Sequence, residues 1–139
     1  MAQNNFIPNE FKISNLIEKY CYDANVLNII KDDTILENLK SKKFGMLSSG
    51  EKRYIEFFII LGLNKEITIL DEPFSEIAPI YIEKMISIIT RLAPNKSFII
   101  SDHSFGSLKQ VCSNLYFMQN GELKNIQNQN ILRKYEYLP

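Results

Sequence analysis

The sequence has few cysteines and no apolar run long enough to span a membrane. Its two cysteines, Cys21 and Cys112, are far apart and form no C-x-x-C motif, so neither a disulfide framework nor a zinc site is indicated. The longest uncharged apolar run, Phe57 to Leu63, is too short to cross a bilayer. No basic-then-apolar N-terminus resembles a signal peptide. These absences favour the cytoplasm as the default compartment.

The chain also lacks an excess of either charge. Sixteen Lys and Arg residues balance sixteen Asp and Glu residues, so the formal net charge is zero. A dedicated nucleic-acid binder usually has a basic excess, and we therefore expect no nucleic-acid partner. Apolar residues make up 45% of the 139 residues and charged residues 23%, which is ordinary globular composition.

The first 63 residues have the apolar spacing of helices. This spacing is found in Ile13, Leu16, Ile17 and Tyr20, and again from Val26 to Ile30. Thr34 and Glu37 are spaced as a capping box before Leu39. From Tyr54 to Leu63 apolar residues flank the helical stripe, which predicts a helix buried on most sides.

From residue 64 onward the pattern is that of strands alternating with helices. Ile67 to Leu70 and Ser97 to Ile100 are short runs typical of buried parallel strands, and Pro79 suits the first position of a helix between them. Asn120-Gly121 predicts a hairpin, and a last helix is expected near Ile131 to Tyr137. The predicted fold class is α/β, with a helical subdomain (1–63) before a mostly parallel core (64–139).

The strand from Ile67 to Leu70 is followed by two carboxylates, Asp71 and Glu72. Ligands of open α/β sheets bind outside the carboxyl ends of the strands. One carboxylate there can hold Mg²⁺, and a second can orient or deprotonate an attacking water. The alternative is a strand that simply ends in a polar turn.

Two further segments could contact phosphate. Leu47-Ser48-Ser49-Gly50-Glu51 precedes the long apolar helix, where backbone N–H groups can hold an anion. Ser48 and Glu51 equally have the spacing of a capping box, which any helix can use. His103, the single histidine, follows the second strand and could reach a phosphate, although a lone histidine is more often structural.

In order and spacing, these motifs resemble the second half of an ATP-binding-cassette (ABC) ATPase. Leu47 to Glu51 resembles the family's signature, with Ser49 in place of the first Gly and Glu51 in place of Gln. Ile67 to Asp71 resembles Walker B, Ser75 to Ala78 the D-loop, and Gln3 stands where the Q-loop Gln belongs. Strand-end and tail residues are most similar to the lipopolysaccharide-export and branched-chain amino-acid group.

The resemblance implies a partial P-loop NTPase core that uses ATP and Mg²⁺. In the family, two subunits sandwich each ATP, so Ser48, Ser49, Gly50 and Glu51 would contact the nucleotide of a second ABC ATPase subunit. Asp71 and Gln3 would bind the metal ion, Glu72 would polarise water, and His103 would contact the γ-phosphate. A transmembrane permease would be the other partner, which places the protein peripherally on the cytoplasmic face of the membrane.

The family's main phosphate-binding motif, G-x-x-x-x-G-K-[ST] or Walker A, is missing from these 139 residues. The nearest match, Gly45 to Lys52, has Glu51 in the Lys position and Lys52 where Ser or Thr should be. We therefore expect a C-terminal part of an ABC subunit that is inactive by itself. Ala78, which replaces the usual D-loop Asp, raises doubt about a symmetric hydrolysis cycle.

Two alternatives remain open at this stage. A DNA-repair or chromosome-maintenance ABC head often has a signature ending in Glu, although no coiled-coil heptads are present here. A non-catalytic ABC-like interaction module is favoured by the missing Walker A motif and by Ala78.

Two surfaces are expected to bind other proteins. Phe6, Phe11, Tyr20 and Tyr22 lie in the segment expected to dock a membrane protein, unless these rings only pack the core. The uncharged strand from Ile67 to Leu70 is expected to leave an edge or apolar face open, so that the chain self-associates or folds its first residues over the edge, with self-association favoured.

Overall fold

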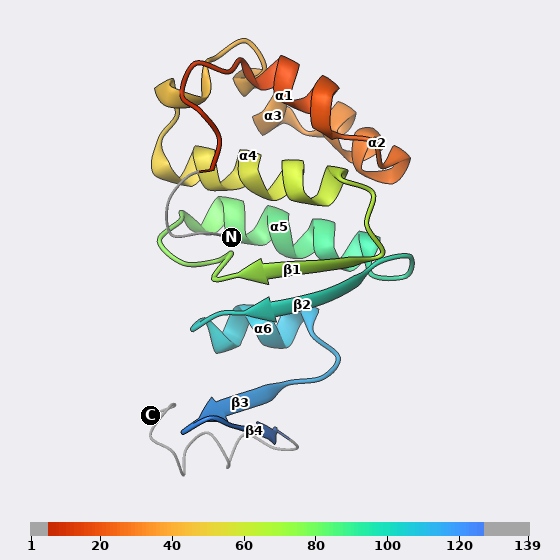
Figure 1. The fold of residues 1–139 in the computed structure, drawn as a ribbon, viewed down its shortest axis with the longest axis vertical. Coiled ribbons are helices and arrows are strands. Elements are labelled where there is room, and N and C mark those ends of the chain that lie inside the picture. The colour runs from red at the N-terminus through yellow and green to blue at the C-terminus, as the bar shows by residue number, and fades with distance from the viewer. Residues whose placement is uncertain (1–5, 127–139) are drawn as a thin grey trace.

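The computed structural model describes residues 6–126 and confirms the expected order of elements. They are α1 (Ile13–Tyr20), α2 (Ala24–Asp32), α3 (Thr34–Leu39), a 3-10 turn (Phe44–Met46), α4 (Ser49–Gly62), β1 (Ile67–Asp71), α5 (Pro79–Leu92), β2 (Ser97–Ser101), α6 (Phe105–Val111), β3 (Tyr116–Gln119) and β4 (Glu122–Asn125) (Figure 1). Gln3 and the last predicted helix lie outside the described residues. The division into subdomains at residues 63 and 64 stays a prediction.

Helix α4 lies between α1–α3 and α5 (Figure 1). Tyr54, Phe57 and Phe58 are fully buried, and the rings of Tyr54 and Phe58 meet edge to face with centroids 5.1 Å apart. This arrangement confirms the prediction of a helix buried on most sides. The stability of such a helix comes mainly from packing against the neighbouring helices.

Side chains cap the N-termini of α2, α3 and α4, with one correction to the sequence prediction. Ser48 and Glu51 form the expected capping box at the start of α4. The capping box predicted for Thr34 and Glu37 is wrong, because Asp33 caps α3 by accepting a hydrogen bond from the Leu36 N–H at 2.9 Å. Asp33 also accepts from the hydroxyl of Tyr54 at 2.7 Å, so tertiary contact selects it as the cap.

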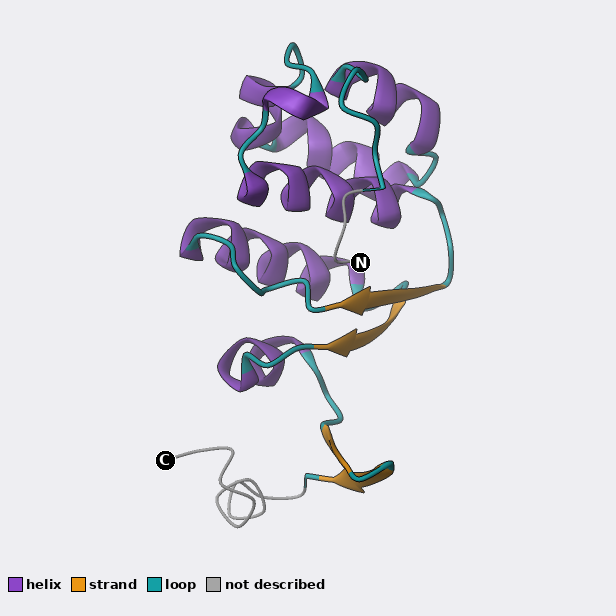
Figure 2. Ribbon diagram, turned by 60° about the vertical axis from the view of Figure 1, so that its left-hand side comes forward, coloured by secondary structure: helices purple, strands orange, loops and turns teal. Residues whose placement is uncertain are grey.

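Strands β1 and β2 form the predicted parallel pair, in the register Ile67 with Ser97 through Asp71 with Ser101 (Figure 2). The prediction that they are buried strands is only half right. Thr68 and Leu70 of β1 are buried, whereas Ile67 and Ile69 are 60% and 65% exposed. Consecutive side chains of a strand point to opposite faces, and in residues 6–126 only one face of this pair is covered.

Strands β3 and β4 form the predicted antiparallel hairpin, in which Gln119 pairs with Glu122. Asn120 and Gly121 have φ angles of 49° and 80°, and a two-residue type I′ turn requires positive φ at both positions. In Figure 2 the hairpin is set apart from β1 and β2, and the described strands form two separate two-stranded sheets. Among residues 6–126 no helix is both long and apolar enough to cross a membrane.

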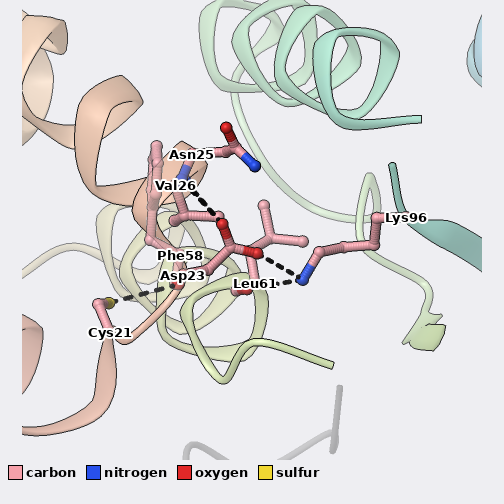
Figure 3. A network of polar contacts seen from close by, with 7 residues as sticks. All are labelled: Cys21, Asp23, Asn25, Val26, Phe58, Leu61 and Lys96. Atoms are coloured by element: carbon pink, nitrogen blue, oxygen red, sulfur yellow. Dashed lines mark hydrogen bonds and ion pairs between the residues drawn. The ribbon is translucent and has the colours of Figure 1, made fainter. Parts of the chain in front are cut away.

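A buried ion pair joins the helical layer to the parallel strands (Figure 3). The ammonium of Lys96, just before β2, lies 3.2 Å from the carboxylate of Asp23 and donates to the Leu61 carbonyl at 3.0 Å. Asp23 also caps α2 through the N–H groups of Asn25 and Val26. Both charged groups are therefore paired and hydrogen-bonded, as burial requires.

Removal of one partner from this pair should strongly destabilise the protein. We expect Lys96→Met to lower the free energy of unfolding by about 3 kcal/mol, because it leaves the buried Asp23 carboxylate without a counter-charge. Urea denaturation followed by circular dichroism measures this loss. Lys84→Met is the matched control, since Lys84 is 40% exposed at 3.9 Å from Asp33 and should cost less than about 1 kcal/mol. Equal losses in the two variants would contradict the assignment.

Candidate functional site

The predicted catalytic residues come together at the carboxyl ends of β1 and β2. Parallel pairing places Asp71 beside Ser101, whose hydroxyl donates a hydrogen bond to the Asp71 carboxylate. The next residue, Glu72, donates its backbone N–H to the Ser101 carbonyl at 2.7 Å. Both strands therefore end at the same edge and deliver their polar residues there.

The carboxylate of Glu72 faces the imidazole of His103. Glu72 Oε1 lies 3.0 Å from His103 Nε2, within hydrogen-bond distance, although the two residues are far apart in the sequence. Glu72 has a φ of 47°, the left-handed region that non-glycine residues seldom occupy. The chain thus turns sharply after β1, and such backbone strain is often found at functional sites. The imidazole is 78% exposed and accessible to a ligand.

Two residues that the sequence analysis missed hold this edge in place. Asp102 accepts hydrogen bonds from the Phe74 N–H at 2.8 Å and the Ser104 N–H at 2.7 Å, which ties the loops after β1 and β2 together. Arg53 of α4 donates from Nη1 to the Glu72 carbonyl at 3.2 Å. An Asp directly after a strand was a usable signal for a loop-binding role, but no sequence pattern pairs Arg53 with Glu72.

The residues of this edge are compatible with Mg²⁺ as the implied metal ion. Within residues 6–126 no three Asp, Glu, His or Cys side chains form a metal cluster. Mg²⁺ usually takes one or two protein carboxylates and completes its shell with water and substrate phosphates. The exposed Asp71 carboxylate, beside a serine hydroxyl, supplies the hard oxygen that such a shell needs.

The signature-like segment forms the N-terminus of α4. Glu51 Oε2 accepts from the Ser48 N–H at 2.7 Å, and the Glu51 N–H donates to Ser48 Oγ at 3.3 Å. The hydrogen bond from the Ser48 backbone is the main reason that the pKa of Glu51 is lowered, and Lys42, 3.7 Å away, contributes further. The capping role considered for Ser48 and Glu51 is thus realised in this structure.

The other residues of the segment lie around this cap. Ser48 and Ser49 are exposed, whereas Gly50 is buried. A Cβ added to Gly50 would lie 3.4 Å from the ring of Tyr81 and 3.9 Å from Ile77, so the glycine packs against α5 and the D-loop-like turn. Ala78 at the end of that turn is the N-cap residue of α5 and makes no side-chain cap. The signature-like segment and the strand ends are joined through α4, whose Arg53 reaches Glu72.

Comparisons with known proteins find relatives among ABC transporter proteins, although no protein-family model matches the chain. ABC transporter A family member 11 of Dictyostelium discoideum is 32% identical over 102 residues, which cover 73% of this chain and 12% of the relative. The lipopolysaccharide export system ATP-binding protein LptB of Escherichia coli is 30% identical over 97 residues, which cover 69% of this chain and 40% of LptB.

A solved ATP-binding subunit of an ABC transporter shares the fold. Its TM-score is 0.75 at 16% identity, over 98% of this chain and 61% of the solved chain. The chain is related to the ABC transporter ATP-binding subunits. The resemblance to the ABC ATPases is thereby confirmed, and so is a partial α/β core of the ABC cassette. The chain spans less than half the length of these two curated ABC relatives.

The lowered pKa of Glu51 predicts a specific pH dependence. A carboxylate whose pKa is lower in the folded state stabilises the protein above its unfolded pKa of about 4.3. This contribution is lost as the pH falls through the folded value. We expect acidification to reduce the free energy of unfolding more in the wild type than in Glu51→Gln, as measured by urea denaturation at a series of pH values.

Ser48→Ala is the matched control for this prediction. It removes the hydroxyl and should cost about 1 kcal/mol at neutral pH. It keeps the backbone N–H that is the main cause of the shift, so the acid-dependent difference from Glu51→Gln should remain. Identical pH profiles for the wild type and Glu51→Gln would contradict the assigned role of the Glu51 carboxylate.

Proposed function

We propose that this chain supplies the signature, Walker B and switch residues of an ABC ATPase that couples ATP binding and hydrolysis to membrane transport. The observation that carries this proposal is the contact between Glu72 and His103 at the shared carboxyl ends of two parallel strands. A carboxylate and an imidazole at hydrogen-bond distance can orient water and contact a phosphate. The relationship to ABC subunits selects phosphoryl transfer among the reactions that such a pair could serve.

Each residue of the proposed site has a role that its position supports. Glu72 orients the attacking water, and His103 contacts the terminal phosphate while holding the Glu72 carboxylate. Asp71 would hold Mg²⁺, which stabilises charge on the transferred phosphoryl group when it is bound. Ser48 and Ser49, exposed at the start of α4, face outward to the nucleotide of a second ABC subunit, with Gln3 assigned to the Q-loop by resemblance alone.

The proposed second partner is a transmembrane permease that docks on the helical part of the chain. Phe6, Phe11 and Tyr22 are 50%, 37% and 64% exposed, while Tyr20 packs against the core. Three of the four aromatic residues that the sequence singled out are thus exposed and accessible to another protein. The protein would accordingly lie on the cytoplasmic face of the membrane.

A non-catalytic interaction module is the second candidate. The 139 residues contain no Walker A motif, and the D-loop position that usually carries Asp is Ala78. A module of this kind would keep the exposed signature and aromatic surfaces without turnover.

The chain by itself should bind Mg-ATP weakly and hydrolyse none measurably. Positioning and charge stabilisation account for nearly all of the catalysis of phosphoryl transfer, and the residues that cradle the β- and γ-phosphates are missing. Isothermal titration with Mg-ATP, combined with a phosphate-release assay, measures both properties. Micromolar affinity or steady turnover would refute this prediction.

In a complete ATPase that contains this sequence, Glu72→Gln should abolish turnover and leave ATP binding intact. Gln keeps the shape of the side chain but cannot accept the proton of an attacking water. Glu83→Gln is the matched control and should keep turnover, since Glu83 is an exposed glutamate of α5 outside the D-loop-like turn. Turnover of Glu72→Gln within tenfold of wild type, about 1.4 kcal/mol in barrier, would reject the catalytic role and favour the interaction module.

A further inference from the structure

Helix α4 carries a buried carboxylate, Glu56, that the proposed mechanism does not use. The residue is 3% exposed. Its Oε1 accepts a hydrogen bond from the backbone N–H of Phe6 at 3.1 Å, across 50 positions of the sequence. Within residues 6–126 this is the one hydrogen bond of the Glu56 side chain. Glu56 therefore fastens residues 6–8, which we call the Phe6 segment, to the middle of α4.

The charge of Glu56 is costly at this position. Burial raises the pKa of the Glu56 carboxyl, and the Phe6 N–H and the positive charges of Arg53 and Lys52 offset only part of this effect. A raised pKa in the folded state means that folding favours the neutral carboxyl, so the charge lowers stability at neutral pH. Natural sequences retain such costly groups mainly at functional sites, which points to a role for this carboxylate.

Arg53 is the neighbour on which this charge acts. It lies three residues before Glu56 in α4, and residues at that spacing share one face of a helix. The guanidinium of Arg53 donates from Nη1 to the backbone carbonyl of Glu72 at 3.2 Å. A carboxylate on the same helix face attracts the guanidinium and restricts its orientation. Adjacent turns of α4 thus hold the Phe6 segment and the turn that contains Glu72.

The Phe6 segment is anchored on one side and open on the other. The Phe6 side chain is 50% exposed, whereas Ile7 is 6% exposed and belongs to the hydrophobic core. A protein that contacts the Phe6 ring therefore acts on a backbone that is hydrogen-bonded to Glu56.

We propose that Glu56 is a positioning residue that links the Phe6 segment to the turn of Glu72. Its carboxylate anchors the Phe6 N–H and orients Arg53, which in turn holds the carbonyl of Glu72. This inference rests on the proposed function, because it assigns Glu56 to the reaction in which Glu72 orients water. Glu56 contributes to that reaction only through Arg53 and the backbone.

Amide hydrogen exchange of the 139-residue chain, followed by NMR, tests the anchor. In Glu56→Met, which keeps a similar length but has no oxygen, the Phe6 amide should exchange at least about tenfold faster, because it loses its acceptor. Glu56→Gln keeps an acceptor oxygen and should keep the protection. Glu83→Met is the matched control at an exposed glutamate of α5 and should not change the exchange of Phe6. Protection of the α4 amides confirms that each variant is folded.

Steady-state kinetics of a complete ATPase that contains this sequence test the link to Glu72. Glu56→Gln should lower kcat about fivefold and leave KM for ATP unchanged, because it removes the charge that orients Arg53. Arg53→Met should lower kcat at least as much, and the double variant should be no slower than Arg53→Met alone. A purely structural role would not give this result, since loss of the costly charge should raise the midpoint of thermal unfolding in Glu56→Gln.

The proposal is overturned by wild-type exchange at Phe6 in Glu56→Met, by wild-type kcat in Glu56→Gln, or by an effect of Glu56→Gln that adds to that of Arg53→Met. The variant Glu72→Gln separates this failure from failure of the proposed function. If Glu72→Gln abolishes turnover while Glu56→Gln has no effect, only the role of Glu56 is wrong. If Glu72→Gln keeps turnover, the proposed function is wrong, and the link from Arg53 to catalysis is wrong with it.

Discussion

The buried ammonium of Lys96 is the interaction on which the arrangement of the two structural layers depends. It neutralises Asp23 at the start of α2, and it donates a hydrogen bond to the carbonyl of Leu61 in the last turn of α4. The carbonyl of Gly62 accepts hydrogen bonds from the N–H groups of both Tyr22 and Asp23 at the same place. A buried charge without a partner is costly. These segments therefore have one relative position at which all of their polar groups are satisfied.

Close packing at this junction restricts the choice of residues further. A Cβ on Gly62 would lie only 2.4 Å from the sulfur of Cys21, so the turn after α1 contacts α4 directly at the glycine. Burial raises the pKa of the Cys21 thiol to about 11, which makes this sulfur a packing group and not a nucleophile at neutral pH. The contacts that fix α4 against α1 and α2 also fix the start of α4, where the signature-like segment lies.

Helix α4 connects that junction to the proposed site. Its first turn carries the exposed serines, its Arg53 holds the carbonyl of Glu72, and its last turn meets Lys96. One rigid element thus relates the surface proposed to meet a second subunit to the carboxylate proposed to orient water.

Local patterns in the sequence predicted the elements, and they singled out the candidate site residues. Apolar spacing predicted α1 and α2, Pro79 predicted the start of α5, and Asn120-Gly121 predicted the hairpin turn. The polar residues at the strand ends pointed to Glu72 and His103. Each of these features depends only on residues that are close together in the chain. Only the tertiary structure decided that Asp33 and not Thr34 caps α3, that Arg53 binds Glu72 and that Lys96 pairs with Asp23. It also decided which face of β1 is exposed, because the burial of a strand depends on elements that pack on it from elsewhere in the chain.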